Sequence, residues 1–515
     1  MTENTQTRPN FLVILTDDQG PWAMSRTMPE LVTPTVDSLV ANGTTFDNFY
    51  CASPVCSPAR ASLLTGRMPS AHGVHDWLVG ERHPDAAEDV YLGGLANLPE
   101  TLQRAGYTCG MSGKWHVGTA QRPAPGFDFW YAHRLGGGPY YGAPVWSEDG
   151  TRVSEERYFT YAVAEEACKF IDQMGQAKRA ADTGAGRFQA GTNDPSQAPG
   201  SDPENPKDNP NPAPFYLQVN FTAPHDPWIN NHPQDLYDLY DGCEFESVPR
   251  EDPHPWTKQF KKDFEDAFAN PTPYLQGYAA SLSGVDRALK DLLDRLKANG
   301  LDENTVVVYM ADNGFSCGHH GIWGKGNGTF PMNFWENSVR VPFVISLPGQ
   351  SQARTVADHV SATSFFPTIC ELAGVEPQED PLRAGDSVAG LVKGERPGDG
   401  TDSVVIYDEY GSGRMIRNGD WKFIDRYDGP IELYNLANDP EERENLADTS
   451  DHKGIQADLK TELHDWFKAH ETAQESAWGR TIIGRGQVHP PRRGYDDERT
   501  YVTTNVCIDG NRDDA

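Results

Sequence analysis

Two apolar runs of strand length, each followed at once by oxygen-bearing side chains, constrain the fold of this chain more than any other feature. The runs are residues 10–15 (Asn-Phe-Leu-Val-Ile-Leu) and residues 305–310 (Thr-Val-Val-Val-Tyr-Met). Uninterrupted runs of this kind are typical of strands covered on both faces, as in the parallel sheet of an α/β protein. The side chains that follow are Asp17 and Asp18 after the first run, and Asp312 and Asn313 after the second.

The ends of these two predicted strands form a candidate cation site. Open α/β sheets bind ligands at the carboxyl ends of their strands, and two adjacent carboxylates are unfavourable neighbours unless a cation lies between them. Four oxygen-bearing side chains suit a hard cation such as Ca²⁺ better than zinc. Two exposed polar turns without a metal explain the same residues, and from these residues alone they are the simpler interpretation.

The segment that begins at Cys56 predicts an anion site. Residues 56–67 (Cys-Ser-Pro-Ala-Arg-Ala-Ser-Leu-Leu-Thr-Gly-Arg) are expected to open a short helix. The free backbone N–H groups and the positive dipole end of a helix start favour an anion, and Arg60 returns to the same helix face. For a lone cysteine in such a place, a buried structural thiol is the alternative.

Lys114 and His116 follow a strand predicted at residues 107–111. Residues two apart on an extended segment point to the same side, so both side chains are expected to reach one anion. A solvated lysine beside an incidental histidine is the alternative.

Two further loops follow predicted strands and carry candidate residues. His225 follows a strand at residues 215–220, in a loop stiffened by prolines on both sides of the histidine. Lys325 lies in a glycine-rich loop after the second apolar run. A structural histidine and a solvated lysine are the alternatives, and His319 and His320 are weaker candidates in the same loop.

Two motifs carry a resemblance to a known family. Residues 56–60 (Cys-Ser-Pro-Ala-Arg) with residues 64–67 (Leu-Thr-Gly-Arg) resemble the signature of the type I sulfatases, in the alkaline phosphatase superfamily. Residues 113–116 (Gly-Lys-Trp-His) are similar to a second motif of that family. The resemblance implies that Cys56 is oxidised after synthesis to formylglycine, whose hydrated aldehyde is the nucleophile.

The resemblance also implies a role for each candidate residue. The ligands of one Ca²⁺ would be Asp17, Asp18, Asp312, Asn313 and the modified Cys56. The charge around the reacting group would be neutralised by Arg60, Lys114 and Lys325. The nucleophile would be held by His116, and the leaving alcohol would take its proton from His225.

The implied activity is hydrolysis of a sulfate ester of a small organic or carbohydrate alcohol, after a formylglycine-generating enzyme has modified Cys56. A formylglycine-dependent phosphonate monoester or phosphodiester hydrolase is one alternative, because its site would look much the same in sequence. A non-catalytic anion-binding protein with an unmodified cysteine is another. Asp76 and Trp77 either line the substrate pocket or lie at its rim.

The composition of the chain limits the kinds of partner and ligand that it can bind. Its formal net charge is −31, which argues against nucleic acid, whose binding needs a basic surface. No apolar run is long enough to span a bilayer, and the polar start of the chain predicts a cytoplasmic location. The eight cysteines include no Cys-x-x-Cys pair, so a zinc cage is not expected and the thiols are predicted to be mainly reduced.

The sequence predicts a large, mostly parallel sheet sandwiched by helices, with a smaller C-terminal α+β subdomain. We assign residues 1–395 to a catalytic domain and residues 396–515 to the smaller subdomain, an antiparallel sheet packed on a last helix. Residues 175–214 are rich in Gly, Pro, Asn and Asp and are predicted to be an inserted flexible loop. Residues 275–297 form the clearest helix, with apolar residues at alternating spacings of three and four.

Overall fold

The structure is a computed structural model, and it describes residues 8–83, 85–86, 91–146, 150–182, 213–257, 262–395 and 405–503. A ten-stranded mixed sheet crosses the molecule in the order β12-β2-β11-β8-β1-β7-β3-β4-β5-β6. On either side of the three central strands β8, β1 and β7, the sheet contains β2 (Thr44–Tyr50), β3 (Thr108–Lys114), β4 (Phe129–His133), β5 (Ala143–Trp146), β6 (Arg152–Glu155), β11 (Phe343–Ser346) and β12 (Arg354–Ser361).

The first apolar run lies at the centre of this sheet. It forms β1 (Asn10–Thr16), which pairs in parallel with β7 (Phe215–Asn220) and with β8 (Thr305–Ala311). All residues of the three strands are buried. Phe11 and Leu12 are neighbours in the chain but lie in different hydrophobic cores, one on each face of the sheet. Burial on both faces explains the uninterrupted apolar runs and confirms the predicted α/β fold.

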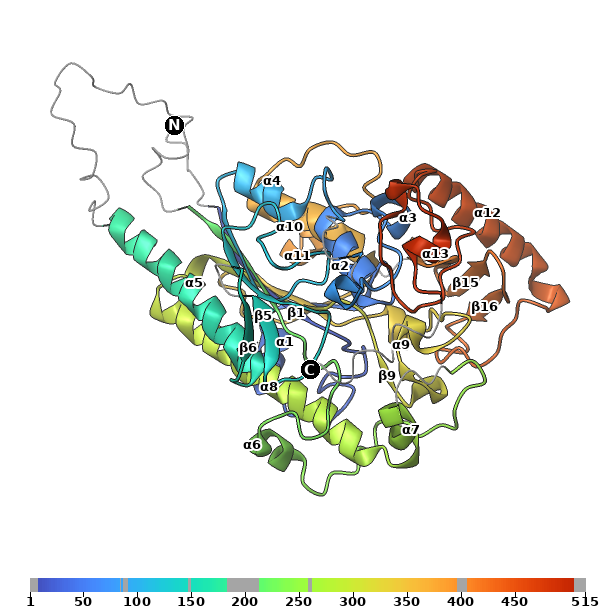
Figure 1. The fold of residues 1–515 in the computed structure, drawn as a ribbon, viewed down its shortest axis with the longest axis horizontal. Coiled ribbons are helices and arrows are strands. Elements are labelled where there is room, and N and C mark those ends of the chain that lie inside the picture. Colours follow the sequence, from blue (N-terminus) through green and yellow to red (C-terminus); the bar gives the residue numbers. More distant parts are fainter. Residues whose placement is uncertain are drawn as a thin grey trace, which may run out of the picture.

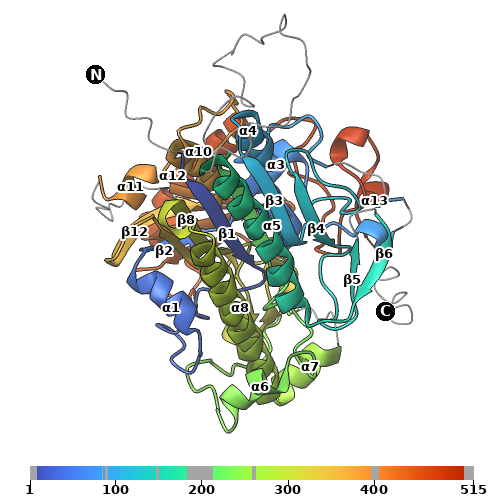
Figure 2. The same ribbon diagram turned by 90° about the vertical axis from the view of Figure 1, so that its left-hand side faces the viewer.

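Helices cover both faces of the sheet (Figures 1 and 2). On one face lie α1 (Pro34–Ala41), α5 (Phe159–Asp182) and α8 (Thr272–Ala298). On the other face lie α2 (Cys56–Thr65), α4 (Leu98–Arg104), α10 (Phe365–Ala373) and α11 (Ala389–Lys393). The predicted helix at residues 275–297 is confirmed within α8.

A second, four-stranded antiparallel sheet follows in the C-terminal part of the chain. Its strands are β13 (Val405–Tyr410), β14 (Gly413–Asn418), β15 (Trp421–Arg426) and β16 (Glu432–Asn435). It packs against α12 (Lys453–His470), whose Leu459 and Leu463 share a core with Phe423. This confirms the predicted antiparallel sheet with a last helix, whereas the domain boundary at residue 396 stays a prediction because residues 396–404 lie outside the described residues.

The structure differs from the prediction at the start of the segment 175–214. Helix α5 continues through the first eight residues of that segment to Asp182. They are mostly good helix formers, and Lys178 Nζ donates to Gly300 O beyond the end of α8. The main part of the predicted loop, residues 183–212, lies outside the described residues.

The remaining elements are short and lie in the connections. They are α3 (Pro69–His72), α6 (Gln234–Tyr237), α7 (Lys262–Ala269), α9 (Glu336–Val339), α13 (Asp497–Thr500), β9 (Ser316–Cys317) and β10 (Trp323–Gly324). After α12 the chain returns to the large sheet's side of the molecule, where Thr472 N donates to Ser70 O.

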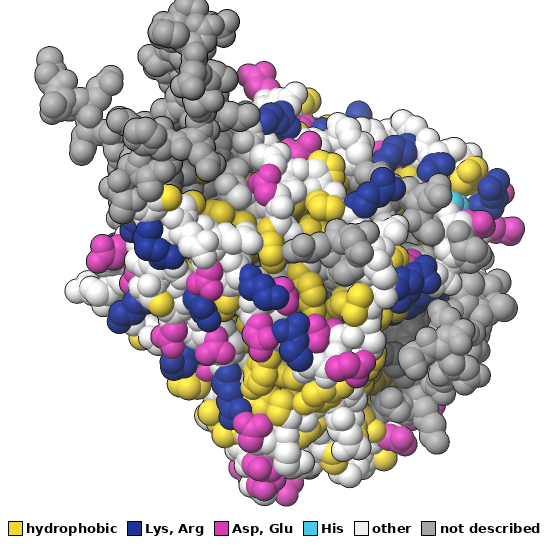
Figure 3. All heavy atoms as spheres, turned by 60° about the vertical axis from the view of Figure 1, so that its left-hand side comes forward, with side chains coloured by type: hydrophobic (Ala, Val, Ile, Leu, Met, Phe, Trp, Pro, Cys, Tyr) yellow, Lys and Arg dark blue, Asp and Glu magenta, His cyan; other side chains and the backbone are white. Residues whose placement is uncertain are grey.

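Charges of both signs are interspersed over the face formed by α5 and α8 (Figure 3). Arg157 pairs with Glu165, Lys169 with Glu166, and Lys290 with Asp294. Among the described residues, no helix is both long enough and apolar enough to cross a membrane. The cytoplasmic location stays a prediction.

Glu409 joins the small sheet to the segment after α2. Its carboxylate accepts from Ser70 N at 2.8 Å and Ser70 Oγ at 2.5 Å, and pairs with Arg414 Nε at 3.0 Å. All three residues are buried. Removing one partner of a buried ion pair leaves the other charge uncompensated, at a cost of about 3–5 kcal/mol.

We therefore expect Glu409→Ala to lower the free energy of unfolding by about 3–5 kcal/mol, measured by urea-induced unfolding. The matched control is Glu441→Ala, whose carboxylate pairs with Arg443 at an exposed surface and contributes little. Equal stability of the two variants would contradict the role assigned to Glu409.

Candidate active site

The carboxyl ends of β1 and β8 bring the two pairs of oxygen-bearing residues together. The strands are adjacent and parallel, with Thr16 opposite Ala311, so the residues that follow them leave the sheet side by side. Cys56, the first residue of α2, lies next to them. One potential ligand atom from each of four buried residues lies within 4.8 Å of the others; the four are Asp17, Asp18, Cys56 and Asp312.

Cys56 is surrounded by charged groups. Its Sγ lies 2.7 Å from Lys325 Nζ and 3.1 Å from Asp17 Oδ1. Burial and the negative charge of Asp17 raise the pKa of the Cys56 thiol, although Lys114 and Lys325 oppose this. The thiol is therefore protonated at neutral pH, and a protonated thiol is a poor nucleophile. Cys56 and Cys51 are both free cysteines.

Three cations lie against the three carboxylates of the cluster. Lys114 pairs with Asp17, Lys325 pairs with Asp18, and Arg60 Nε lies 2.7 Å from Asp312 Oδ2. All six side chains are buried, and buried charges are stable only when they are paired.

The pKa values of Asp17 and Lys325 reflect this pairing. Burial raises the pKa of Asp17, but the Lys114 ammonium and other nearby cations lower it below its usual value. Burial lowers the pKa of Lys325, but Asp18 and neighbouring acidic groups raise it well above its usual value. Both side chains are therefore charged over the physiological pH range.

The donor set of the cluster fits a hard cation. Asn313 Nδ2 donates to Asp18 Oδ1 at 2.8 Å, whereas Asn313 Oδ1 is buried and has no hydrogen-bond partner among the described residues. A buried acceptor without a partner costs free energy unless a ligand uses it. Carboxylate and amide oxygens are the ligands that Ca²⁺ prefers.

His225 lies at the open edge of the buried cluster. Its Nε2 is 3.9 Å from Asp18 Oδ2, its Nδ1 is 2.7 Å from the Asp226 carbonyl oxygen, and 21% of the side chain is exposed. The carbonyl oxygen can only accept, so Nδ1 carries the proton of the neutral ring and Nε2 is the atom that exchanges protons. Tyr140 Oη donates to His225 O and fixes the loop.

His116 lies in a different setting from the one that the spacing predicts. Strand β3 ends at Lys114, and His116 has a φ of 57°, so the backbone between them is not extended. His116 Nε2 lies 3.1 Å from the Leu78 carbonyl oxygen, and its Nδ1 is buried without a partner among the described residues. Among the described residues, Lys114 contacts the cluster through Asp17, whereas His116 contacts the loop behind it through the Leu78 carbonyl oxygen.

The weaker candidates pack against aromatic rings. The ring of His319 lies 4.8 Å from that of Trp22, and the ring of His320 stacks on Trp335 at 4.5 Å. Neither contact involves the charged cluster. Asp76 is buried and accepts hydrogen bonds from Tyr410 Oη and Gly486 N.

Asn220 is a residue of the site that the sequence analysis missed. It ends β7 at the same edge of the sheet, and its Nδ2 donates to the Lys114 carbonyl oxygen at 3.0 Å. Arg60 Nη1 donates to the same oxygen at 2.8 Å. A polar residue at the end of an otherwise apolar strand was the available signal.

The comparisons with known proteins identify the family of this chain. A family model for sulfatases matches residues 9–375, and a model for the C-terminal part of N-sulphoglucosamine sulphohydrolase matches residues 318–469. The chain belongs to the sulfatase family. It is a sulfuric ester hydrolase.

Known relatives match most of this sulfatase. A choline-sulfatase of Rhizobium meliloti is 29% identical over 507 residues, which covers 90% of this chain and 87% of that protein. A solved structure in complex with its substrate D-glucosamine-2-N,6-O-disulfate has a TM-score of 0.69 at 22% identity, covering 90% of this chain and 98% of that one. The phosphonate monoester hydrolase of Agrobacterium radiobacter has a TM-score of 0.62 at 20% identity, covering 90% and 96%. The structural matches show the same fold.

Gln487 of this sulfatase has a role that the sequence analysis did not predict. It lies in the segment after α12. Its Oε1 accepts from His75 N at 2.7 Å, and its Nε2 donates to Gly73 O at 2.8 Å. The same loop continues to Leu78, whose N donates to Ser57 Oγ at 3.0 Å, next to Cys56. Gln487 therefore holds the loop that supports the start of α2.

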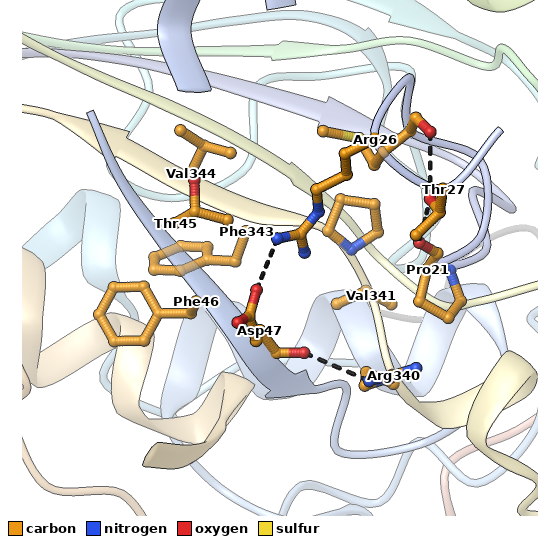
Figure 4. A pocket seen from close by; sticks show the side chains of 12 residues that line it. Pro21, Arg26, Thr27, Thr45, Phe46, Asp47, Arg340, Val341, Phe343 and Val344 are labelled. Atoms are coloured by element: carbon orange, nitrogen blue, oxygen red, sulfur yellow. Dashed lines mark hydrogen bonds and ion pairs between the residues drawn. The ribbon is translucent and has the colours of Figure 1, made fainter. Parts of the chain in front are cut away.

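A hollow of about 340 Å³, lined by the paired strands β2 and β11 and by residues 21–27, is a separate feature (Figure 4). Arg26 Nη1 lies 2.6 Å from Asp47 Oδ1 in its wall, so the charge of the arginine is balanced there. None of the predicted site residues lines the hollow.

Gln487→Leu should leave the buried N–H groups of His75 and Asp76 without an acceptor. We expect their amide hydrogen exchange to become about tenfold faster or more, because each lost bond costs roughly 1–3 kcal/mol. Gln474→Leu, which removes an exposed hydrogen bond to Arg492 O, is the control. Unchanged exchange in the 73–79 loop would show that Gln487 does not hold it.

Proposed function

We propose that this sulfatase hydrolyses a sulfate ester of a small organic or carbohydrate alcohol to the alcohol and inorganic sulfate. The reaction uses formylglycine made from Cys56 and one Ca²⁺. The observation that carries the proposal is the convergence of Lys325 Nζ and Asp17 Oδ1 on Cys56 Sγ, at 2.7 Å and 3.1 Å. A nucleophile at position 56 therefore lies in contact with both the carboxylate cluster and the ammonium group of Lys325.

The proposed Ca²⁺ ligands are the oxygen atoms at the ends of β1 and β8, together with residue 56. When bound, the ion supplies positive charge that makes an oxygen nucleophile at position 56 more acidic and polarises the sulfate group. The unpartnered Asn313 Oδ1 supports this assignment. The proposed ligands are Asp17, Asp18, Cys56, Asp312 and Asn313.

The modified side chain explains why a cysteine stands at position 56. A hydrated formylglycine supplies one hydroxyl for attack on sulfur. After the transfer, the second hydroxyl loses its proton and becomes the aldehyde C=O, while the C–O bond to the sulfate breaks and sulfate leaves. A maturation enzyme is the partner that this chemistry requires. The neutral, buried thiol of Cys56 supports the view that the unmodified residue is not the nucleophile.

The charged side chains of this chain bind and stabilise the reacting group. Lys114 and Lys325 neutralise the charge that builds up on the sulfate oxygens, and Arg60 acts through its ion pair with the cluster and its bond to Lys114 O. As an imidazolium, His225 keeps its proton at Nδ1 and gives the second proton, at Nε2, to the oxygen of the leaving alcohol. His116 fixes the loop that carries Leu78, and through it the start of α2.

The test is a panel of substrates assayed with protein made in its own host. We expect turnover of 4-nitrophenyl sulfate and of alkyl sulfates to exceed turnover of the matching phosphonate monoesters. Calcium chelation should abolish this turnover and added Ca²⁺ should restore it, while Cys56→Ala should be inactive. Faster turnover of the phosphonate monoesters would favour the hydrolase alternative. No turnover together with an unmodified Cys56 would favour the anion-binding alternative, and no turnover by protein with modified Cys56 would contradict the proposed function.

Replacing His225 should affect esters of poor leaving groups most. We expect His225→Gln to lower kcat for an alkyl sulfate by roughly 10²-fold or more, the usual contribution of a general acid. The loss for 4-nitrophenyl sulfate should be much smaller, because its leaving group is stable as an anion. Equal losses for the two esters would contradict the acid role of His225.

A further inference from the structure

Arg82 lies beside His225, outside the charged cluster. Its Nη2 donates to the Gly137 carbonyl oxygen at 3.2 Å. Gly137 in turn touches the ring of His225, because a Cβ on this glycine would lie 2.8 Å from His225 Cε1. Gly137 therefore lies between the Arg82 guanidinium and the His225 imidazole, and a larger residue at position 137 would displace the histidine ring.

The neighbouring acid does not neutralise Arg82. Glu81 pairs with Arg134 at 2.7 Å and with Arg152 at 3.0 Å. Among the described residues, no carboxylate forms an ion pair with Arg82; Asp226 is the acidic group whose charge acts on it. Burial lowers the pKa of Arg82, and the charge of Asp226 opposes this only in part.

The hydrogen bonds among the described residues leave most of the Arg82 donors open to a ligand. Arginine carries five N–H donors, and within the described residues one of them is used, by Gly137. The guanidinium carbon lies 5.9 Å from the centre of the Trp77 ring, which limits its orientation. A planar, always charged fork of this kind suits a carboxylate or a sulfate.

We propose that Arg82 determines substrate specificity by binding a second anionic group on the alcohol portion of the sulfate ester. This rests on the proposed function, because His225 protonates the leaving alcohol and Arg82 lies next to His225. The substrate class is then a sulfated sugar that carries a further sulfate or a carboxylate. A quaternary ammonium alcohol such as choline is disfavoured by the same charge.

The experiment compares four sulfate esters in the wild-type enzyme. Glucosamine 2-N,6-O-disulfate and a glucosamine 6-sulfate linked to a uronic acid carry a second sulfate and a carboxylate, respectively. N-Acetylglucosamine 6-sulfate has a neutral alcohol portion and is called the neutral ester below. Choline sulfate has a cationic alcohol portion. We expect kcat/KM for at least one doubly anionic ester to exceed that for the neutral ester about tenfold, as one charge-assisted contact provides. The two doubly anionic arms tell a sulfate from a carboxylate.

The variants assign this preference to Arg82. Arg82→Gln should remove it, mainly by raising KM, and Arg82→Lys should keep part of it. Arg287→Gln, which removes an exposed arginine on α8 paired with Asp235, should preserve it. Added salt should lower kcat/KM for the doubly anionic esters more in the wild-type enzyme than in Arg82→Gln.

Two outcomes would overturn the proposal. If choline sulfate or the neutral ester is hydrolysed as well as the doubly anionic esters, and Arg82→Gln lowers all rates equally, Arg82 has no role in specificity while the sulfatase function stands. If Ca²⁺-loaded enzyme with modified Cys56 hydrolyses none of the four esters and no aryl sulfate, the proposed function fails and this proposal fails with it.

Discussion

Three buried carboxylates held against three buried cations are the constraint on which the rest of this structure depends. The protein keeps Asp17, Asp18 and Asp312 out of water, and each must have a cation close by. Two adjacent parallel strands supply the carboxylates. The cations come from other elements: Lys114 ends β3, Lys325 follows β10 and Arg60 lies in α2. The apolar strands are therefore a rigid frame that fixes charges at one place, where the chemistry of a sulfate ester needs them.

The C-terminal part of the chain supports this frame from outside. Glu409 in the small sheet binds Ser70, and Gln487 binds the backbone of the 73–79 loop. Both contacts act on the segment that follows α2, the helix that begins at Cys56. The large sheet on one side and the C-terminal segments on the other thus set the position of residue 56. Residues late in the chain therefore support a catalytic residue that lies near its start.

Short stretches of the sequence were enough to predict those strands and helices whose structure depends mainly on neighbouring residues. The apolar runs, the periodicity of α8 and the residues that follow each strand are readable in short windows, so the central strands followed from the sequence. The placement of Lys325 with Asp18 and Cys56 was implied only by the resemblance to the sulfatases. The extended backbone assumed from Lys114 to His116 is not present, because β3 ends at Lys114 and His116 has a positive φ, while a role of His116 at the nucleophile stays a prediction. Gln487 had no local signal, since its partner His75 lies 412 residues earlier in the chain.

The mass of the proteolytic peptide that contains Cys56 tests the central claim most directly. The peptide should be taken from active protein made in its own host, alongside the same peptide from inactive protein made without a maturation enzyme. The account predicts that the active protein carries an aldehyde in place of the thiol and that the inactive protein retains the cysteine. An unmodified Cys56 in fully active protein would contradict the account.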